Sequence, residues 1–320
     1  MKNIEVFPYT NIYKKGVAEC LQRNYEWMGQ RTIEEILDWI SPITDYDWIS
    51  NKNDLQSENP YKKGVVLVEK GSNVVGYLGL VTSKRTSEDG KVIVYGAPTT
   101  WAIDVDYRLY LIKAMKIIIS SVDVICDFTA RKSVEDTFRK MFKFNINESN
   151  DYLLYPIPCA IDKLDIRWIN CVDEIEDEEL EKIYLDHSVF YGVRLIVYMD
   201  AKNGEKGYLF YKVYDENSAR IRILMIVNTD LFVVECHEII WKIMQHEFYE
   251  QIGEDELLCK IMQNISEGKM ICAECNKMLL KGQEINYPIM KEKKSIKICN
   301  QEELVNDFMY TEIAMLPNMI

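Results

Sequence analysis

Two cysteines carry the spacing whose chemistry is easiest to recognise in this chain. Cys272 and Cys275 form a Cys-x-x-Cys pair, which supplies half of the ligands in many structural zinc sites. Such a site takes four ligands and usually a second pair of this kind, but only Cys299 follows. We therefore expect no metal here, and we expect the two thiols to lie on a helix over residues 266–280.

The three histidines are the other candidates for catalysis by side-chain chemistry. They are His187, His237 and His246, and the last two are expected on one helix. A nucleophilic mechanism would need a Ser or Cys on a sharp, glycine-flanked turn beside such a base, and no such turn accompanies them. We expect all three histidines to be structural.

Composition excludes several classes of function. The chain has 320 residues, 48% of them hydrophobic, and a net charge of −13. It can bury enough apolar surface to fold, and its acidity argues against a general nucleic-acid binder, which needs clustered Lys and Arg. Seven acids within residues 173–181 are expected to form a solvated helix face.

The terminus and the cysteines predict a cellular location. No apolar run has the length of a signal peptide or a membrane span, so no membrane partner is expected. The nine cysteines are odd in number, scattered, and partly inside apolar runs. That pattern is typical of reduced thiols in a cytoplasmic protein.

The elements that would position a site alternate between strands and helices in the first half. Thr32 and Glu35 have the spacing of a capping box and predict the start of a helix over residues 32–40. The other helices are expected at 12–27, 106–121 and 133–144, and the strands at 3–9, 63–70, 73–83, 91–105, 123–130 and 151–158. This order predicts an α/β fold with a mixed sheet covered by helices on both faces.

A similar order recurs in the second half. Helices are expected at 173–190 and 232–249, and strands at 165–171, 193–200, 208–214, 220–228 and 256–263. Beyond these we expect strands at 284–291 and 295–299 and a helix at 301–315. The chain is therefore predicted to form two domains in tandem, 1–160 and 161–320.

The block from Trp101 to Asn145, WAIDVDYRLYLIKAMKIIISSVDVICDFTARKSVEDTFRKMFKFN, resembles the core of the GCN5-related N-acetyltransferase (GNAT) family. In that family a strand leads through a Q/R-x-x-G-x-G/A loop into a helix, and a second strand and a helix follow. Here the strand would end at 102–105, the loop would be 108–113 and the second strand 124–130. The resemblance covers residues 3–158, and the second half looks more faintly like another GNAT domain.

The loop departs from the family pattern at both glycines. Leu111 and Lys113 stand in their places, whereas Arg108 matches the first position. Those glycines let backbone N–H groups approach the pyrophosphate of coenzyme A at a helix N-terminus. Lys113 would either supply a compensating charge or close the site.

The resemblance implies roles for eight residues and an acetyl-CoA cosubstrate. Backbone groups of a splayed strand would contact the pantetheine, cations would hold the pyrophosphate, a carboxylate would accept the amine proton, and a tyrosine would protonate the thiolate. The matching positions are Ala102, Ile103 and Val105 for pantetheine, Arg108 and Lys113 for pyrophosphate, Asp104 for the base, and Tyr152 or Tyr155 for the acid.

The predicted function is transfer of an acetyl group from acetyl-CoA to the amine of a small or medium-sized acceptor. Residues 44–61 are polar and are a candidate lid over the acceptor pocket. Two alternatives stay open. The first is a GNAT-fold protein that has lost catalysis and binds a ligand or partner. The second is an aminoacyl-transferase of the FemABX kind, which the acidity of the chain disfavours.

Overall fold

The computed structural model divides into two compact units. It describes residues 4–48, 59–69, 73–86, 90–129, 132–160, 162–215, 219–249, 259, 263, 271–288, 290–300 and 307–316. Unit 1 comprises Met1–Ile146, Lys297–Val305 and Tyr310–Leu316, and unit 2 comprises Asn147–Ile296, Asn306–Met309 and Pro317–Ile320. The domain boundary expected after residue 160 stays a prediction.

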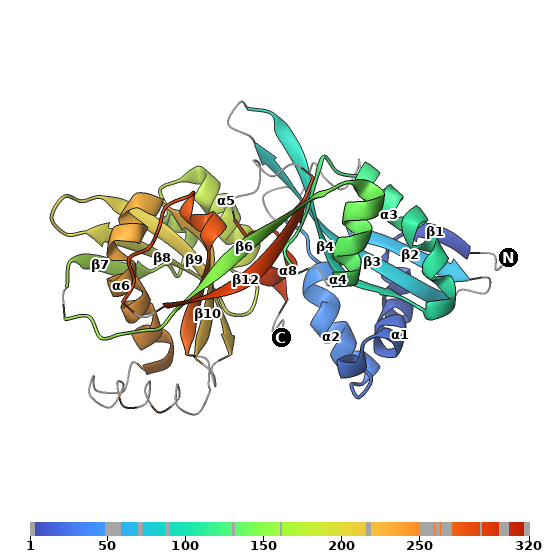
Figure 1. Cartoon of the computed structure of the whole chain (residues 1–320), viewed down its shortest axis with the longest axis horizontal. Helices are drawn as coiled ribbons and strands as arrows, with labels where there is room; N and C mark the ends of the chain where they lie inside the picture. Colours follow the sequence, from blue (N-terminus) through green and yellow to red (C-terminus); the bar gives the residue numbers. More distant parts are fainter. Residues whose placement is uncertain are drawn as a thin grey trace. The chain divides into compact units, whose positions relative to one another are not determined.

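Unit 1 is built on the strand order β1-β2-β3-β4-β5 (Figure 1). The bounds are β1 (Ile4–Pro8), β2 (Gly64–Glu69), β3 (Asn73–Thr86), β4 (Val92–Ile103) and β5 (Val124–Asp127). The first four strands are antiparallel to their neighbours, and β5 is parallel to β4. On its other edge β5 pairs antiparallel with the last residues of β12 (Met290–Cys299). This confirms the predicted mixed sheet.

The helices of unit 1 begin where local signals predict. In α2 (Ile33–Thr44) the Glu35 N–H donates to Thr32 Oγ1 at 3.2 Å and the Thr32 N–H donates to Glu35 Oε2 at 2.7 Å, which confirms the capping box. This helix runs past Pro42, because the Asp45 N–H still reaches the Ser41 carbonyl. Both α1 (Lys14–Asn24) and α3 (Leu111–Ser120) pack on β3. Since β3 is buried without alternation over residues 74–83, helices cover both of its faces.

Unit 2 repeats this topology. Its strands are β7 (Leu164–Trp168), β8 (Val193–Asp200), β9 (Lys206–Asp215), β10 (Arg220–Val227), β11 (Cys272–Asn276) and β6 (Asn145–Leu154) in that spatial order. The first four are antiparallel, β11 is parallel to β10, and β6 is antiparallel to β11. Strands β7 to β10 and β11 therefore correspond in order and direction to β1 to β4 and β5.

Two helices connect the strands of unit 2. The Asp177 carboxylate caps α5 (Glu178–His187) by accepting from the N–H groups of Glu179 and Leu180 at 2.9 and 3.0 Å. Its acidic first turn is exposed, as the dense acidic run predicted. The longer α6 (Thr229–Met244) follows β10 and ends in a π-helical turn, η7 (Gln245–Tyr249). Most of α6 is buried, so it forms a central part of this unit's core.

The prediction was wrong around the Cys-x-x-Cys pair. The expected helix at 266–280 is strand β11 followed by a short 3-10 turn, η8 (Lys277–Leu280). All five residues of β11 are buried and have strand partners on both sides, so tertiary pairing overrides the helical spacing. In place of the two strands expected at 284–291 and 295–299 the structure has the single strand β12, and residues 284–288 belong to no strand. Of the strand expected at 256–263 only Cys259 and Gln263 are described, and both are helical.

The C-terminal helix is shorter than expected. Residues 301–306 lie outside the described part of the chain, and the helix α8 is limited to Glu312–Met315. Most of the candidate lid, residues 49–58, also lies outside it.

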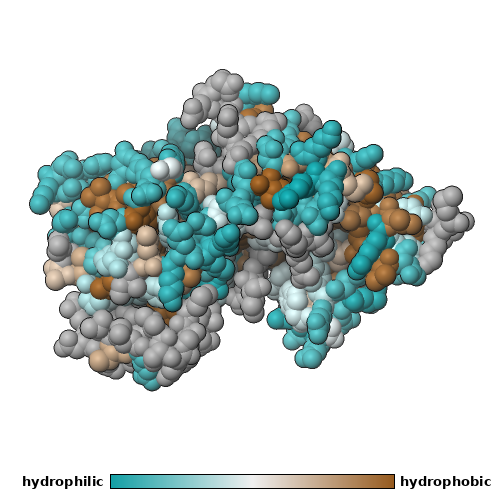
Figure 2. All heavy atoms as spheres, in the orientation of Figure 1, coloured by the Kyte–Doolittle hydropathy of each residue, from teal (hydrophilic) through white to brown (hydrophobic). Residues whose placement is uncertain are grey.

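The surface agrees with the composition. On the face in Figure 2 most of the coloured surface is hydrophilic, with smaller hydrophobic patches in both units. All nine cysteines are free thiols. Within the described ranges, no helix combines the length and the apolar character needed to cross a membrane.

Candidate active site

The centre of the candidate site is the place where β4 and β5 separate. Their parallel pairing comprises Tyr95 with Val124 and Gly96 with Ile125. Strand β4 then continues to Ile103, whereas β5 ends at Asp127 and pairs there with β12. Among the described residues the second half of β4 thus has no pairing with β5. A strand edge of this kind offers backbone N–H and C=O groups to an extended, amide-bearing ligand.

A β-bulge lies in this unpaired half of β4. Tyr77 of β3 pairs with Ala102 and Gly79 pairs with Thr99, so two residues of β4, Thr100 and Trp101, face only Leu78. Thr100 has φ +48°, in the left-handed region that a β-branched residue rarely adopts. Gly79 permits the bulge, because a Cβ there would lie 2.6 Å from the Thr99 carbonyl oxygen. The bulge re-aims the backbone groups of β4 next to the separation point.

The three residues predicted to contact pantetheine span the end of β4. Ala102 and Ile103 pair with Tyr77 and Gly76 of β3, so they are the last residues of the strand. Val105 begins the 3-10 segment η4 (Val105–Tyr110) and is 69% exposed. The backbone therefore passes directly from the unpaired strand edge into the helical segment.

The predicted phosphate loop is η4 and the first turn of α3. Arg108 and Lys113 lie there and are both exposed. No side chain caps η4 or α3; the first turn of η4 contains Asp106, and that of α3 contains no acid. The positive end of the helix dipole and two nearby cations together favour an anion at this position, despite the missing glycines.

Asp104, the predicted base, joins β4 to α1. Its carboxylate pairs with Arg23 Nη2 at 2.9 Å and accepts from Asn24 Nδ2 at 2.6 Å. Arg23 also donates to the Val74 carbonyl of β3 at 2.9 Å. Hydrogen bonding to Asp104 raises the pKa of Arg23. The contacts give Asp104 a positioning role, and its role as base stays a prediction.

Tyr152 and Tyr155, the predicted acids, belong to unit 2, whereas the other candidates belong to unit 1. Tyr152 lies on β6 opposite Cys275 and is buried, with Lys277 Nζ 6.0 Å from its ring centroid. Tyr155 is also buried, and burial raises the pKa of its hydroxyl. A raised pKa suits a proton donor, and the roles of both tyrosines stay predictions.

The corresponding position in unit 2 is built differently. Leu224 is the bulged residue of β10, and a helix begins five residues later in each unit (100 to 105 and 224 to 229). Before α6, however, Asn228 caps the helix by accepting from the Leu231 N–H at 3.2 Å, and Asp230 adds a negative charge to the first turn. In unit 1 the first turn of η4 also contains an acid, Asp106, so the difference between the units is the cap. Of the described helix starts that follow the two bulges, those in unit 1 lack a side-chain cap.

The cysteine pair and the histidines stay outside this site. Cys272 and Cys275 are three residues apart on β11, so their side chains point to opposite faces of the sheet. Burial raises the pKa of Cys272 to about 12 and raises that of Cys275 further. His187 Nδ1 lies 2.8 Å from the Ile183 carbonyl and His237 Nε2 lies 3.1 Å from the Ile157 carbonyl. His246 stacks on Trp168 at 3.9 Å between ring centroids.

The described residues also show no metal centre. No group of three or more His, Cys, Asp or Glu side chains in these ranges could hold a metal ion.

Comparison with known proteins extends the resemblance to the fold. No protein-family model and no curated protein sequence matches the chain. Among solved structures, a conserved protein of unknown function from Enterococcus faecalis, described as a probable N-acyltransferase, matches with a TM-score of 0.52 and 10% identity. The match covers 93% of this chain and 72% of that one.

Two more distant matches have lower scores. The GCN5-related N-acetyltransferase from Sphaerobacter thermophilus matches with a TM-score of 0.38 and 9% identity, over 92% of this chain and 94% of that one. Saccharomyces cerevisiae N-myristoyltransferase with bound myristoyl-CoA matches with a TM-score of 0.47 and 8% identity, over 97% and 83%. The Enterococcus match shows that the chain shares the mixed α/β fold of that probable N-acyltransferase.

Proposed function

We propose that the protein is an acyl-CoA-dependent N-acyltransferase whose coenzyme binds to unit 1. One observation carries this proposal. The unpaired, bulged half of β4 leads directly into an uncapped helix start with Arg108 and Lys113 beside it. The order of these features along the chain matches the order of the groups in an acyl-CoA. The thioester comes first, the two amides of pantetheine follow, and the pyrophosphate comes last.

The reaction requires few catalytic groups from the protein. The neutral amine attacks the thioester carbonyl carbon, a C–N bond forms, the C–S bond breaks, and the amine proton leaves for a base while the thiolate gains a proton. Holding the two reactants together supplies a large part of the acceleration. We propose backbone groups at Ala102 and Ile103 as the pantetheine contacts and Asp104 as the proton acceptor.

We further propose acetyl-CoA as the cosubstrate and an amine of a small or medium-sized molecule as the acceptor. The net charge of −13 favours a cationic amine by long-range attraction. The same field opposes an anionic coenzyme, which is why the local groups at the start of α3 matter. A cytoplasmic location is part of this proposal and is supported by the nine free thiols.

A binding protein without catalysis is the second candidate function. The observation in its favour is the side chains of Leu111 and Lys113 at the positions where the family has glycine. The FemABX alternative has no comparable observation in its favour.

Two measurements separate the candidates. A catalyst releases free coenzyme A from acetyl-CoA in the presence of an amine, which a thiol-reactive dye follows, whereas a binding protein shows calorimetric binding without release. If Asp104 is the base, Asp104→Asn lowers kcat by about 10²–10⁴-fold. Arg23→Met removes the same ion pair but leaves the carboxylate, so it is the matched control and should keep most of kcat.

A further inference from the structure

Unit 2 contains a gap beside β10 that corresponds to the open edge of β4. In the described part of the chain β10 pairs in parallel with β11 at Arg220, Ile221 and Arg222. Strand β10 then continues to Val227, while β11 ends at Asn276 and the chain turns into η8. The bulged residue Leu224 lies two residues past the last pair, and Thr100 in unit 1 lies four residues past its last pair.

The chain's own C-terminal segment fills this gap. The Phe308 N–H donates to the Leu224 carbonyl at 2.9 Å, and the Phe308 side chain is completely buried. The Asp307 carboxylate accepts from the Met309 N–H at 2.8 Å, which closes an Asx turn around Phe308. Phe308 lies inside this turn, and the next residue, Met309, is buried as well.

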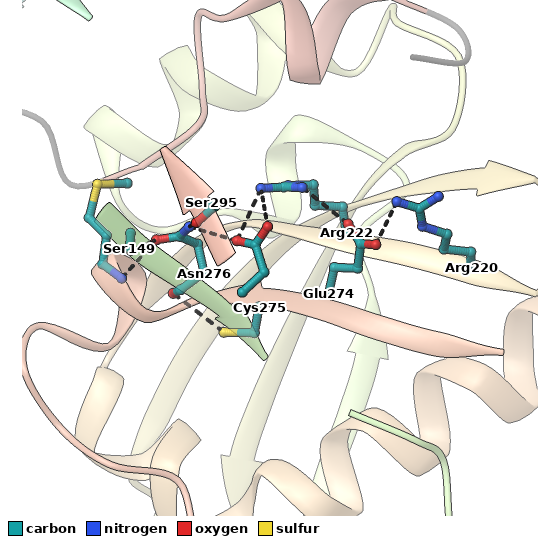
Figure 3. Close-up of polar contacts among 9 residues, drawn as sticks. Ser149, Arg220, Arg222, Glu274, Cys275, Asn276 and Ser295 are labelled. Atoms are coloured by element: carbon teal, nitrogen blue, oxygen red, sulfur yellow. Dashed lines mark hydrogen bonds and ion pairs between the residues drawn. The ribbon is translucent and has the colours of Figure 1, made fainter. Parts of the chain in front are cut away.

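Arg220, Arg222 and Glu274 form a charged layer across β10 and β11 (Figure 3). The guanidinium of Arg222 lies 4.7 Å from the centroid of the Phe308 ring. Arg222 donates to Glu274 at 3.1 Å and to Asp151 at 3.4 Å, and Arg220 pairs with the second oxygen of Glu274. A cation at this distance from an aromatic ring centroid is attracted by the ring.

We propose that the gap beside β10 is a peptide-binding site and that the segment Asp307–Met309 is its built-in ligand. Its recognition elements are one strand-edge carbonyl at Leu224 and one aromatic pocket over Arg222. These two contacts favour a peptide with an Asp-Phe turn. A coenzyme is disfavoured, because Asn228 and Asp230 occupy the adjacent helix start. The inference concerns unit 2 alone and holds whether or not unit 1 is an acyltransferase.

Hydrogen exchange on the unaltered protein gives the first test. The Phe308 amide should exchange as slowly as the amides of β10, because it is hydrogen-bonded and buried. Exchange at the rate of a free peptide would overturn the proposal. This measurement needs no variant, so it decides even if substitutions at Phe308 prevent folding.

Substitution and a peptide in trans give the second test. Phe308→Ala should speed exchange at residues 307–309 by about tenfold or more, and Phe308→Leu by less. Val234→Ala, on the exposed face of α6, is the control and should leave the exchange rates at residues 307–309 unchanged. The acetylated, amidated peptide Asp-Phe-Met-Tyr-Thr should then bind the Phe308→Ala protein but not the wild type. Its counterpart with alanine for phenylalanine should bind neither. Equal binding of the first peptide to both proteins, or none to Phe308→Ala, would overturn the proposal.

Discussion

Removal of the Asp104 carboxylate is the perturbation whose size the structure of unit 1 defines best. Asp104 directly follows β4 at the candidate site, and its oxygens hold Arg23 at 2.9 Å and Asn24 at 2.6 Å on α1. In Asp104→Ala both contacts disappear, while Arg23 keeps its hydrogen bond to the Val74 carbonyl. We expect α1 to pack less firmly on the sheet.

The two lost contacts determine how much the free energy of unfolding should fall in Asp104→Ala. The ion pair is partly exposed, with side-chain exposures of 43% for Arg23 and 22% for Asp104, so it is worth about 0.2–1 kcal/mol. The hydrogen bond from Asn24 is worth about 1 kcal/mol. Asp104→Ala should therefore lower the free energy of unfolding by about 1–2 kcal/mol.

Urea unfolding followed by circular dichroism measures this difference. Arg23→Met should lower the free energy of unfolding by a smaller amount, because the hydrogen bond between Asn24 and Asp104 remains. The double variant should lose less than the sum of the two single variants by about 0.5 kcal/mol or more, since both remove the same pair. A change under about 0.3 kcal/mol in Asp104→Ala would refute the assignment of Asp104 as a tie between β4 and α1.

Three further predictions concern charged groups in the two units. Arg108→Glu and Lys113→Glu should each weaken acetyl-CoA binding by about tenfold in calorimetry, with a weaker effect at high salt, whereas Lys116→Glu, farther along α3, should have less effect. Arg222→Met should lower the free energy of unfolding by about 3–5 kcal/mol in urea, because it leaves two buried carboxylates without this partner. Burial lowers the pKa of Lys212 to about 7, so the unfolded chain binds more protons above that pH. The wild type should therefore gain stability relative to Lys212→Met as pH rises from about 7 towards 10.5, and a flat or opposite dependence would contradict this.

The first unit was largely predictable from the sequence because its signals are local. The capping box of Thr32 and Glu35, the β-branched runs of β2 and β3, and the order of elements led to the mixed sheet. The bulge at Thr100 was missed, because nothing in its residue type indicates a left-handed backbone. Gly79 was the available signal, since its lack of a Cβ is what the bulge requires.

The second unit shows where local reasoning fails. The helical spacing in 266–280 was misleading, because β11 is specified by its partners β10 and β6, which are distant in sequence. The insertion of Phe308 against Leu224 and Arg222 likewise depends on contacts between residues over 80 positions apart (308 − 224 = 84). The ion pair of Asp104 with Arg23 also joins distant residues, so spacing alone did not reveal it.

Calorimetric titration of the full chain with acetyl-CoA tests the central claim most directly. The account predicts one site per chain, with a dissociation constant in the micromolar range that increases with salt. Of the described helix starts that follow the two bulges, those in unit 1 lack a side-chain cap, whereas Asn228 caps the one in unit 2. Two equivalent sites would contradict the assignment to unit 1. The absence of any binding heat, in a sample that unfolds cooperatively and is therefore folded, would contradict the acyltransferase proposal itself.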